Sequence, residues 1–289
     1  MSGAVGFIGL GNIGAPMASR LVDWPDGLVV FDVHAPAVEP FVQRGATAVE
    51  SPAEVAAAAG VICIVVQNEE QVREVLDGPE GLLRSAAPGT VVAVHSTISA
   101  EGAESLAELA AGGQVDLVDA PVSGGAMGAH SGTLAVMAGG TEAALERARP
   151  VFERFATMVQ HMGPVGAGTR TKIARNLITF TSFAVAGEAQ RLAEAAGLDL
   201  TKLGEVVRHS DAVTGGAGAV MIRPTAAPMS PDDGLRPIFG HSASLGGKDL
   251  ELARRMAEEL GVDAPFAELA ERWLPVALGL VEPGPEESR

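Results

Sequence analysis

The first half of the chain alternates short apolar runs with longer segments whose apolar positions recur at helical spacing. The runs predict strands at Ala4–Ile8, Leu28–Phe31, Val61–Val66, Val91–Val94, Val115–Val118, Leu134–Ala138 and Thr157–Gln160. The segments between them predict helices at Asn12–Val22, Pro36–Arg44, Ala100–Ala111 and Glu142–Phe155. Near-continuous apolar strands separated by helices are typical of a parallel sheet covered on both faces. We therefore predict a doubly wound α/β domain over residues 1–163.

The pattern changes after Gly163-Pro164, where helical spacing continues without further strands. A long helix is predicted at Thr169–Ala196, with Gly197 in the position that ends it. Three shorter helices are predicted at Thr201–His209, Lys248–Leu260 and Pro265–Leu280, and the Gly-, Pro- and Ser-rich segment 213–247 predicts no element. The second domain, residues 164–289, is therefore expected to be all-helical and joined to the first by a long interdomain helix.

Composition limits the classes of function. The chain has 289 residues, of which 47 % are hydrophobic, and a formal net charge of −16. A charge of that sign argues against binding nucleic acid or anionic lipid through a basic surface. The single cysteine, Cys63, permits no intramolecular disulfide. The N-terminus has no basic region typical of a signal peptide, and no apolar run reaches the roughly 18 residues that a spanning helix needs. These features predict a protein of the cytoplasm with no membrane segment.

A glycine-rich loop follows the first predicted strand and opens the first predicted helix. It reads Gly9-Leu10-Gly11-Asn12-Ile13-Gly14. In this pattern the first glycine permits a tight turn, the second lets a pyrophosphate approach the backbone, and the third lets helix and strand pack closely. The strand–loop–helix context favours a dinucleotide-binding, Rossmann-type fold over a plain turn.

An acidic residue, Asp32, follows the second predicted strand. A carboxylate at this position can accept hydrogen bonds from both hydroxyls of an adenosine ribose and repels a 2′-phosphate. We therefore expect NAD to be preferred over NADP, although Asp32 could instead simply start a turn. A methyltransferase that binds S-adenosylmethionine shares such a loop and acid, but it does not explain the third glycine or the second half of the chain.

Two further segments carry polar groups that could hold a substrate. Ser123, Gly124 and Gly125 follow a predicted strand, and a hydroxyl beside unobstructed backbone N–H groups suits a carboxylate or phosphate. Lys172 and Asn176 are four residues apart and so share one face of the long helix. A lysine acts as a general acid or base when burial lowers its pKa. Alone, each pattern is also compatible with a flexible turn or a surface lysine.

Thr97 lies just after the strand predicted at Val91–Val94, where it could contact a nicotinamide ribose. Alternatively, Ser96 and Thr97 could cap the following helix. The histidines show no spacing with acids or cysteine that is typical of metal ligands, so we predict no metal site.

Together these segments resemble the β-hydroxyacid dehydrogenase family, which includes 3-hydroxyisobutyrate dehydrogenase and the 6-phosphogluconate dehydrogenases. The resemblance runs in order through nearly the whole chain. It covers the cofactor loop at residues 9–18, the segment from Asp119 to Gly125, the stretch from Gly163 to Lys172 and Asn176, and Lys248-Asp249-Leu250.

The resemblance implies a role for each of these positions. Lys172 would exchange a proton with the substrate oxygen while hydride passes to or from the nicotinamide. Ser123 and the N–H groups of Gly124 and Gly125 would hold the carboxylate of a small 3-hydroxy acid, and Asn176 would orient it. Thr97 and Lys248 would line the cofactor site. By the same resemblance we expect a homodimer or homotetramer.

Some positions depart from the family pattern. Val66-Gln67 stands where relatives often have Leu-Pro, at a contact with the cofactor made largely by backbone. His241 stands where many relatives have Phe, which changes the expected substrate pocket and puts simple 3-hydroxyisobutyrate specificity in doubt. An imine reductase and a non-catalytic binding module of the same fold are the alternatives. Both usually lack the lysine, so Lys172 argues against them.

Overall fold

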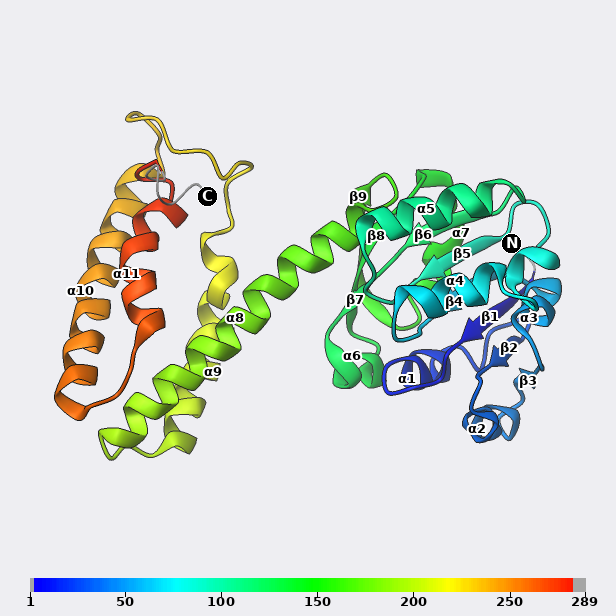
Figure 1. Ribbon diagram of the computed structural model, residues 1–289, viewed down its shortest axis with the longest axis horizontal. Helices are drawn as coiled ribbons and strands as arrows, with labels where there is room; N and C mark the ends of the chain where they lie inside the picture. The colour runs from blue at the N-terminus through cyan, green and yellow to red at the C-terminus, as the bar shows by residue number, and fades with distance from the viewer. Residues whose placement is uncertain (1–2, 283–289) are drawn as a thin grey trace. The chain divides into compact units, whose positions relative to one another are not determined.

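A computed structural model describes residues 3–282 and shows two compact units, which divide between Asn176 and Leu177 (Figure 1). Residues 1, 2 and 283–289, at the ends of the two predicted domains, lie outside the described residues. Within the described range, all strands belong to the first unit and the second unit is helical. This arrangement confirms the predicted fold class.

The first unit is built on a nine-stranded sheet with the order β3-β2-β1-β4-β5-β6-β8-β7, and β9 pairs with β8. The strands from β3 to β6 are parallel, and β8 runs antiparallel to β6 and β7. Their bounds are β1 (Ala4–Ile8), β2 (Leu28–Phe31), β3 (Thr47–Ala48), β4 (Ala59–Ile64), β5 (Val91–Val94), β6 (Asp116–Asp119), β7 (Val122–Ser123), β8 (Leu134–Gly139) and β9 (Ala156–Gly163).

Helices cover both faces of this sheet. Their bounds are α1 (Gly14–Ser19), α2 (Glu39–Val42), α3 (Pro52–Ala58), α4 (Glu69–Asp77), α5 (Ala100–Ala111), α6 (Gly125–Ser131) and α7 (Glu142–Phe152). Side chains of α1, α6 and α7 bury with one set of strand residues, including Phe7 and Val30. Side chains of α3, α4 and α5 bury with the opposite set, including Ile8 and Ile62. Successive strand residues point to opposite faces, so the continuous apolar runs fill both cores.

Four of these helices begin at a residue whose side chain accepts a hydrogen bond from the first turn. Ser51 caps α3, Asn68 caps α4, Ser99 caps α5 and Thr141 caps α7. Each cap satisfies a backbone N–H that has no partner within the helix. The alternative that Ser96 and Thr97 cap α5 is therefore wrong, because Ser99 does so.

Several boundaries differ from the predicted ones. The helix predicted at Asn12–Val22 is limited to Gly14–Ser19, and the segment predicted as helical at Pro36–Arg44 is a 3₁₀ turn, Ala35–Ala37, followed by α2. The polar helix α4 and the two-residue strands β3 and β7 were not predicted, because their apolar patterns are too weak or too short.

The helical part begins with α8 (Ala167–Ala195), whose first turns belong to the first compact unit. It continues with α9 (Leu200–Thr214), α10 (Arg236–Leu260) and α11 (Pro265–Ala277). Gly197, Gly215 and Gly261 end α8, α9 and α10 with φ of +75°, +86° and +67°, a left-handed conformation that favours glycine. Helix α10 starts at Arg236 rather than at the predicted Lys248. Pro237 does not interrupt it, because proline is tolerated in the first turn of a helix.

Candidate active site

The glycine loop follows β1 at the carboxyl edge of the sheet, and its three glycines have different surroundings. Gly9 has a φ of +92°, and a Cβ added there would overlap the Val65 carbonyl oxygen. A Cβ added to Gly14 would overlap the carbonyl oxygen of Gly9. A Cβ on Gly11 would meet no atom within 4 Å. Gly9 and Gly14 are therefore needed for backbone packing, whereas Gly11 leaves space open beside the loop.

That space is a cavity of about 590 Å³ between the ends of β1, β2 and β4. Its lining residues are Ile8, Gly9, Gly11, Asn12, Ile13, Gly14, Phe31, Asp32, Val33, His34, Val65, Val66, Gln67, Gln71, Glu74 and Val75. Two of them, Asp32 and Glu74, carry carboxylates, and none of the described lining residues is a lysine or arginine. The cavity walls are mostly apolar, which suits a flat heterocycle.

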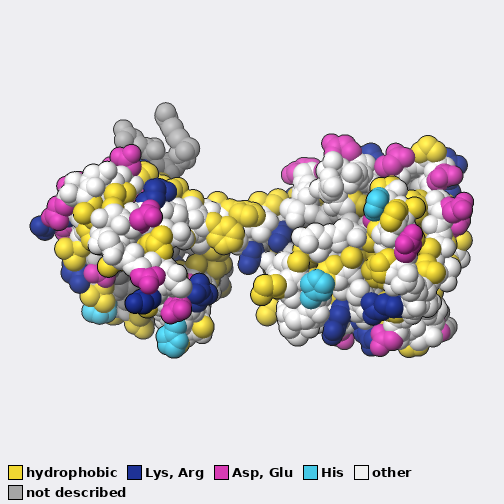
Figure 2. Space-filling model, turned by 90° about the horizontal axis from the view of Figure 1, so that it is seen from below, with side chains coloured by type: hydrophobic (Ala, Val, Ile, Leu, Met, Phe, Trp, Pro, Cys, Tyr) yellow, Lys and Arg dark blue, Asp and Glu magenta, His cyan; other side chains and the backbone are white. Residues whose placement is uncertain are grey.

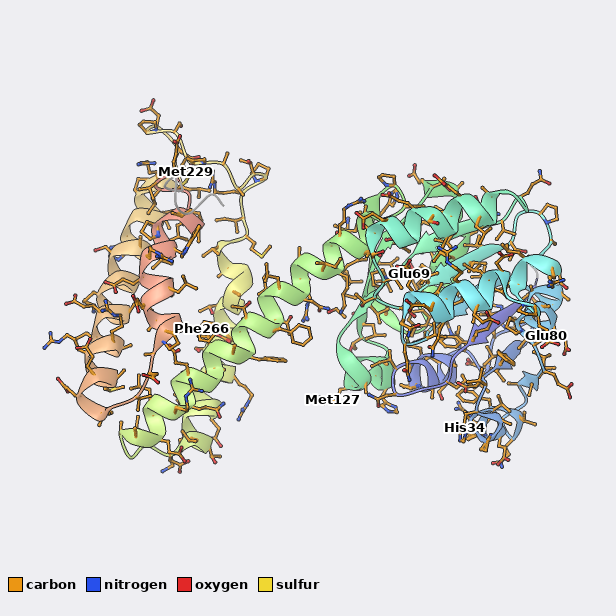
Figure 3. The ribbon with its side chains drawn as sticks, viewed as in Figure 1. His34, Glu69, Glu80, Met127, Met229 and Phe266 are labelled. Atoms are coloured by element: carbon orange, nitrogen blue, oxygen red, sulfur yellow. The ribbon has the colours of Figure 1, made fainter. Side chains whose placement is uncertain are left out.

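Asp32 is half-buried at this cavity and is held by the glycine loop itself. Its Oδ2 accepts the backbone N–H of Leu10 at 2.6 Å, and its Oδ1 accepts that of His34 at 2.7 Å. Each oxygen retains a further lone pair, so the carboxylate can still accept a hydroxyl. His34, labelled in Figure 3, is exposed. The arrangement orients Asp32 beside the glycine loop, as the ribose hypothesis requires.

The residues after β4 and β5 meet at the same edge. Ser96 Oγ donates to the Val66 carbonyl oxygen at 2.7 Å and accepts the Val66 N–H at 2.9 Å. Val66 and Gln67 line the cavity, and Thr97 is exposed just beyond Ser96. Ser96 therefore joins the ends of two strands, which leaves the Thr97 side chain available at the carboxyl edge.

Ser123 ends the short strand β7 and precedes the turn into α6. Its Oγ is buried and has no hydrogen-bond partner among the described residues. Gly124 has a φ of +129° and Gly125 a φ of +63°, conformations that favour glycine. A buried hydroxyl without a partner is costly unless a ligand or water completes its hydrogen bond. Ser123 therefore fits a residue that binds a polar substrate group.

Lys172 lies one turn inside α8, and its Nζ donates to the Val122 carbonyl oxygen at 2.7 Å. This bond places the amine at the residue next to Ser123. Burial, and secondarily the charge of Arg175, lowers the pKa of Lys172 below its usual value. Asn176 is half-buried on the same helix face one turn later. The structure thus brings a half-buried amine and a buried hydroxyl to one short segment.

His95 supports this segment from the end of β5. It is 4 % exposed, its ring makes edge contacts with Phe152 and Phe155, and its Nδ1 lies 2.7 Å from the Ala120 carbonyl oxygen. Since a carbonyl only accepts, Nδ1 carries the proton. Burial lowers the pKa of His95 to about 4, so the ring is neutral near pH 7.

Two residues expected at the site belong to the second unit. His241 and Lys248 are exposed and lie two turns apart on one face of α10. The Lys248 amine lies 3.1 Å from the Asp249 carboxylate. The structure therefore brings the glycine loop, Asp32, Val66 and Gln67 to one cavity and sets Lys172 next to Ser123, whereas His241 and Lys248 lie on a helix of the second unit.

Sequence reasoning missed Gln71 and Glu74 of the cavity and the supporting His95. Gln71 and Glu74 lie on the polar helix α4, so a helix predicted after β4 would have brought both to the carboxyl edge of the sheet. The buried ring of His95 has no signal in the sequence.

No helix among residues 3–282 is long and apolar enough to span a membrane. In the same range, no three His, Cys, Asp or Glu side chains are grouped as metal ligands would be.

Two family models together match almost the whole chain. Residues 4–163 match the NAD binding domain of 6-phosphogluconate dehydrogenase. Residues 166–282 match the model described as NAD-binding of NADP-dependent 3-hydroxyisobutyrate dehydrogenase. An uncharacterized oxidoreductase of Mycobacterium tuberculosis is 53 % identical over 99 % of this chain and 96 % of its own length. The NAD-dependent L-serine dehydrogenase of Pseudomonas aeruginosa is 36 % identical over 92 % and 89 %.

Comparison with solved structures agrees with these sequence matches. An oxidoreductase from Mycobacterium avium 104 superimposes with a TM-score of 0.91 at 50 % identity, covering 96 % of this chain and 98 % of that one. The 3-hydroxyisobutyrate dehydrogenase of M. tuberculosis, solved with L-serine, gives 0.65 at 34 % identity, covering 95 % and 93 %. An imine reductase from a Pseudomonas species gives 0.74 at 17 % identity, covering 95 % of this chain and 93 % of that one, which shows a shared fold alone.

Proposed function

The chain belongs to the β-hydroxyacid dehydrogenase family and binds a nicotinamide cofactor, and from this premise we propose that it interconverts a small 3-hydroxy acid and the matching semialdehyde. The observation that carries the proposal is the bond from Lys172 Nζ to the Val122 carbonyl, directly beside the buried Ser123 hydroxyl. An amine and a hydroxyl so placed can handle, respectively, the reacting oxygen and the carboxylate of one small substrate.

The residues present fit the cofactor. Gly11 leaves open the space that a pyrophosphate needs, and the adjoining cavity of about 590 Å³ can take the adenosine part. Gly9, Leu10, Gly11, Asn12, Ile13, Gly14, Asp32, Val66 and Gln67 would hold it, with Thr97 toward the nicotinamide. When bound, the nicotinamide accepts or supplies the hydride of the reaction.

Lys172 would act as the general acid and base. In oxidation the neutral amine takes the proton of the substrate hydroxyl as the carbon loses hydride, and in reduction the ammonium returns it to the carbonyl oxygen. Half-burial, which lowers the pKa of Lys172, brings the neutral form closer to physiological pH. Ser123, with the N–H groups of Gly124 and Gly125, would hold the carboxylate, and Asn176 would orient the substrate. By the resemblance, Lys248 would contact the cofactor and His241 the substrate.

The test is a panel of 3-hydroxy acids and semialdehydes, including L-serine and 3-hydroxyisobutyrate, with both cofactors. We expect Lys172→Ala to lower kcat on the best substrate by on the order of 1,000-fold while NADH binding is retained. Lys202→Ala is the matched control, because Lys202 is 80 % exposed on α9 and should leave kcat unchanged. Wild-type turnover by Lys172→Ala would refute the assignment and reopen the non-catalytic alternative.

We propose that NAD is preferred over NADP. Asp32 and Glu74 supply two carboxylates to the adenosine cavity, and the described lining residues offer no cation for a 2′-phosphate. Asp32→Ala should reduce the ratio of kcat/KM for NAD over NADP by about tenfold or more. A wild-type enzyme that is faster with NADP at equal concentration contradicts this preference.

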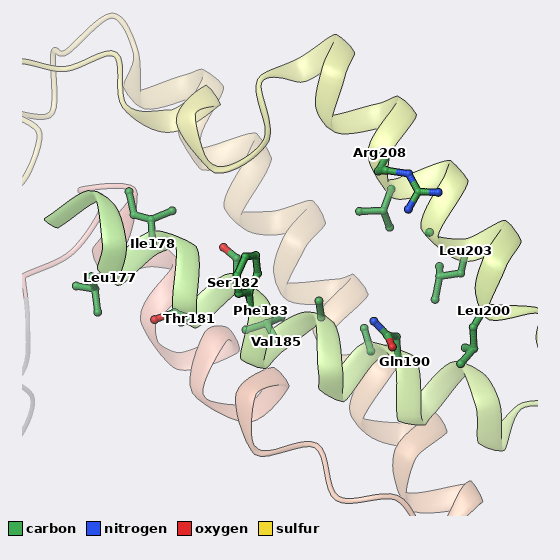
Figure 4. A pocket seen from close by; sticks show the side chains of 14 residues that line it. Leu177, Ile178, Thr181, Ser182, Phe183, Val185, Gln190, Leu200, Leu203 and Arg208 are labelled. Atoms are coloured by element: carbon green, nitrogen blue, oxygen red, sulfur yellow. The ribbon is translucent and has the colours of Figure 1, made fainter. Parts of the chain in front are cut away.

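We also propose a homodimer or homotetramer that forms through the helical domain. Helices α8 and α9 line an apolar pocket of about 930 Å³, with Phe183, Val185 and Leu203 among its walls (Figure 4). Figure 2 shows hydrophobic side chains gathered along the exposed part of α8. A large exposed apolar patch marks an association surface. Phe183→Asp should dissociate the oligomer in analytical ultracentrifugation, whereas Met158→Asp, at a similarly exposed methionine of β9, should not.

Residues 1–163 would form the cofactor domain and residues 164–289 the helical domain, a division that the limits of the two matching family models support. Cys63, the only cysteine, is buried in β4, which suits the reducing cytoplasm.

A further inference from the structure

Asp119, at the end of β6, spans the gap between the sheet and the start of α8. Its side chain is fully buried, with 0 % exposure. Oδ1 accepts the N–H of Gly166 at 2.8 Å, and Oδ2 accepts the N–H of Thr169 at 2.7 Å. Both donors belong to the first turn of α8 or precede it by one residue, and that turn contains no acidic residue of its own. A carboxylate from a distant strand therefore caps this helix.

The helix start is also packed against the sheet by backbone contact. A Cβ added to Gly168 would overlap the carbonyl oxygens of Met137 and Asp119, and one added to Gly139 would overlap the Asp119 carboxylate. At Gly168 the first turn of α8 therefore meets main-chain atoms at the ends of β6 and β8. A shift of the turn is therefore resisted by main-chain atoms as well as by the two hydrogen bonds.

The same short segment contacts α8 twice. Asp119 binds Thr169 through its carboxylate, and three residues later the Val122 carbonyl accepts the amine of Lys172, which itself lies three residues after Thr169. The contacts close a small ring that contains the segment before Ser123 and the first turns of α8. We propose that Asp119 is a positioning residue, which fixes the start of α8 and thereby sets the Lys172 amine beside residues 122 and 123.

A second buried carboxylate provides the control. Glu188 of α8 is 5 % exposed, and its two oxygens accept the N–H groups of Phe266 and Ala267, each at 2.9 Å, in the first turn of α11. Figure 3 labels Phe266 at the start of α11, beside α8. Asp119 and Glu188 thus make the same kind of helix cap at different helices. Asp119 caps α8, whose second turn carries Lys172, whereas Glu188 caps α11.

The test uses the full chain labelled with [ε-¹³C]lysine, because its only lysines are Lys172, Lys202 and Lys248. Lys172→Arg assigns the signal. In the wild type we expect Lys172 to titrate below the ordinary value of a lysine, because burial lowers its pKa. In Asp119→Asn, whose amide cannot accept both N–H groups, the Lys172 signal should move toward the titration of an ordinary exposed lysine, and kcat should fall by about 100-fold. Glu188→Gln should lower the unfolding midpoint and leave the Lys172 titration and kcat unchanged.

Thr169→Pro is the second variant, should Asp119→Asn fail to fold. It removes one donor to Asp119 in a first turn, where proline is tolerated, and should shift the same signal. An unchanged Lys172 titration in both variants overturns the proposal, as does an equal shift in Glu188→Gln. The inference depends on the proposed function only for its effect on kcat. If Lys172→Ala keeps its turnover, the proposed function fails, while the lysine titration still decides whether Asp119 positions the amine.

Discussion

The two compact units of this chain bury their apolar residues to very different degrees. In the first unit, two continuous clusters fill both faces of the sheet with side chains from every major helix. Among the described residues of the second unit, the buried hydrophobic side chains are Leu192, Ala193, Met229, Phe239, Ala257 and Leu278. Phe180, Phe183 and Val213 remain 62 %, 66 % and 75 % exposed. The first unit therefore has a continuous core on each face of its sheet, whereas the second leaves large apolar side chains exposed.

Substitution of two glycines of α8, one in each unit, should give the largest difference in unfolding free energy. An alanine at Gly168 would overlap main-chain atoms of the sheet, so Gly168→Ala should cost about 4 kcal/mol of unfolding free energy. At Gly187 the nearest atom to an added Cβ is Arg191 Nη1 at 3.9 Å, so Gly187→Ala should stabilise by up to about 1 kcal/mol. Urea unfolding followed by Trp24 in the first unit and Trp273 in the second reports each effect, with the other tryptophan replaced by Phe. A Gly168→Ala protein of wild-type stability would contradict the tight packing.

Acid should weaken the first unit in particular. The pKa of His95 is lowered by burial to about 4, below its ordinary value of 6.5. The unfolded chain therefore takes up a proton before the folded one does as the pH falls. The contribution of neutral His95 is complete above pH 6.5 and is lost as the pH falls toward 4, about 3 kcal/mol in all. Guanidinium unfolding monitored at Trp24 at pH 7 and pH 5 should show part of this loss, and His95→Gln should show less pH dependence.

Protein concentration should change the stabilities of the two units by different amounts, and this is the smallest of the expected effects. If a second copy covers α8 and α9, each tenfold rise in concentration adds up to about 1.4 kcal/mol to the stability of the associated unit. The unfolding midpoint reported by Trp273 should rise with concentration more than that reported by Trp24. Equal and constant midpoints over a hundredfold range would show that the helical unit needs no partner.

The sequence predicted the first unit better than the second for a physical reason. Buried strands such as Val91–Val94 and helix caps such as Ser99 are local features, and the glycine loop is a local motif with one structural solution. Helix α10 was predicted too short, because Gly240, Gly246 and Gly247 weaken its pattern and tertiary contacts support its first turns, where Arg236 donates to the Met229 and Leu280 carbonyl oxygens. The strand β7 and the helix α6 are likewise set by their neighbours and not by their own residues.

In the candidate site, too, some features follow from local sequence and others only from the tertiary structure. Residue types and spacing alone determined the alternating α/β pattern, the glycine loop with Asp32, and the scarce lysine on the long helix, because each is encoded within a few neighbouring residues. Only the tertiary structure decided that Asp32 binds the Leu10 N–H, that the Lys172 amine meets Val122, and that Asp119 caps a helix some fifty residues later in the chain. Such contacts depend on where strand ends converge, and that is a property of the folded sheet.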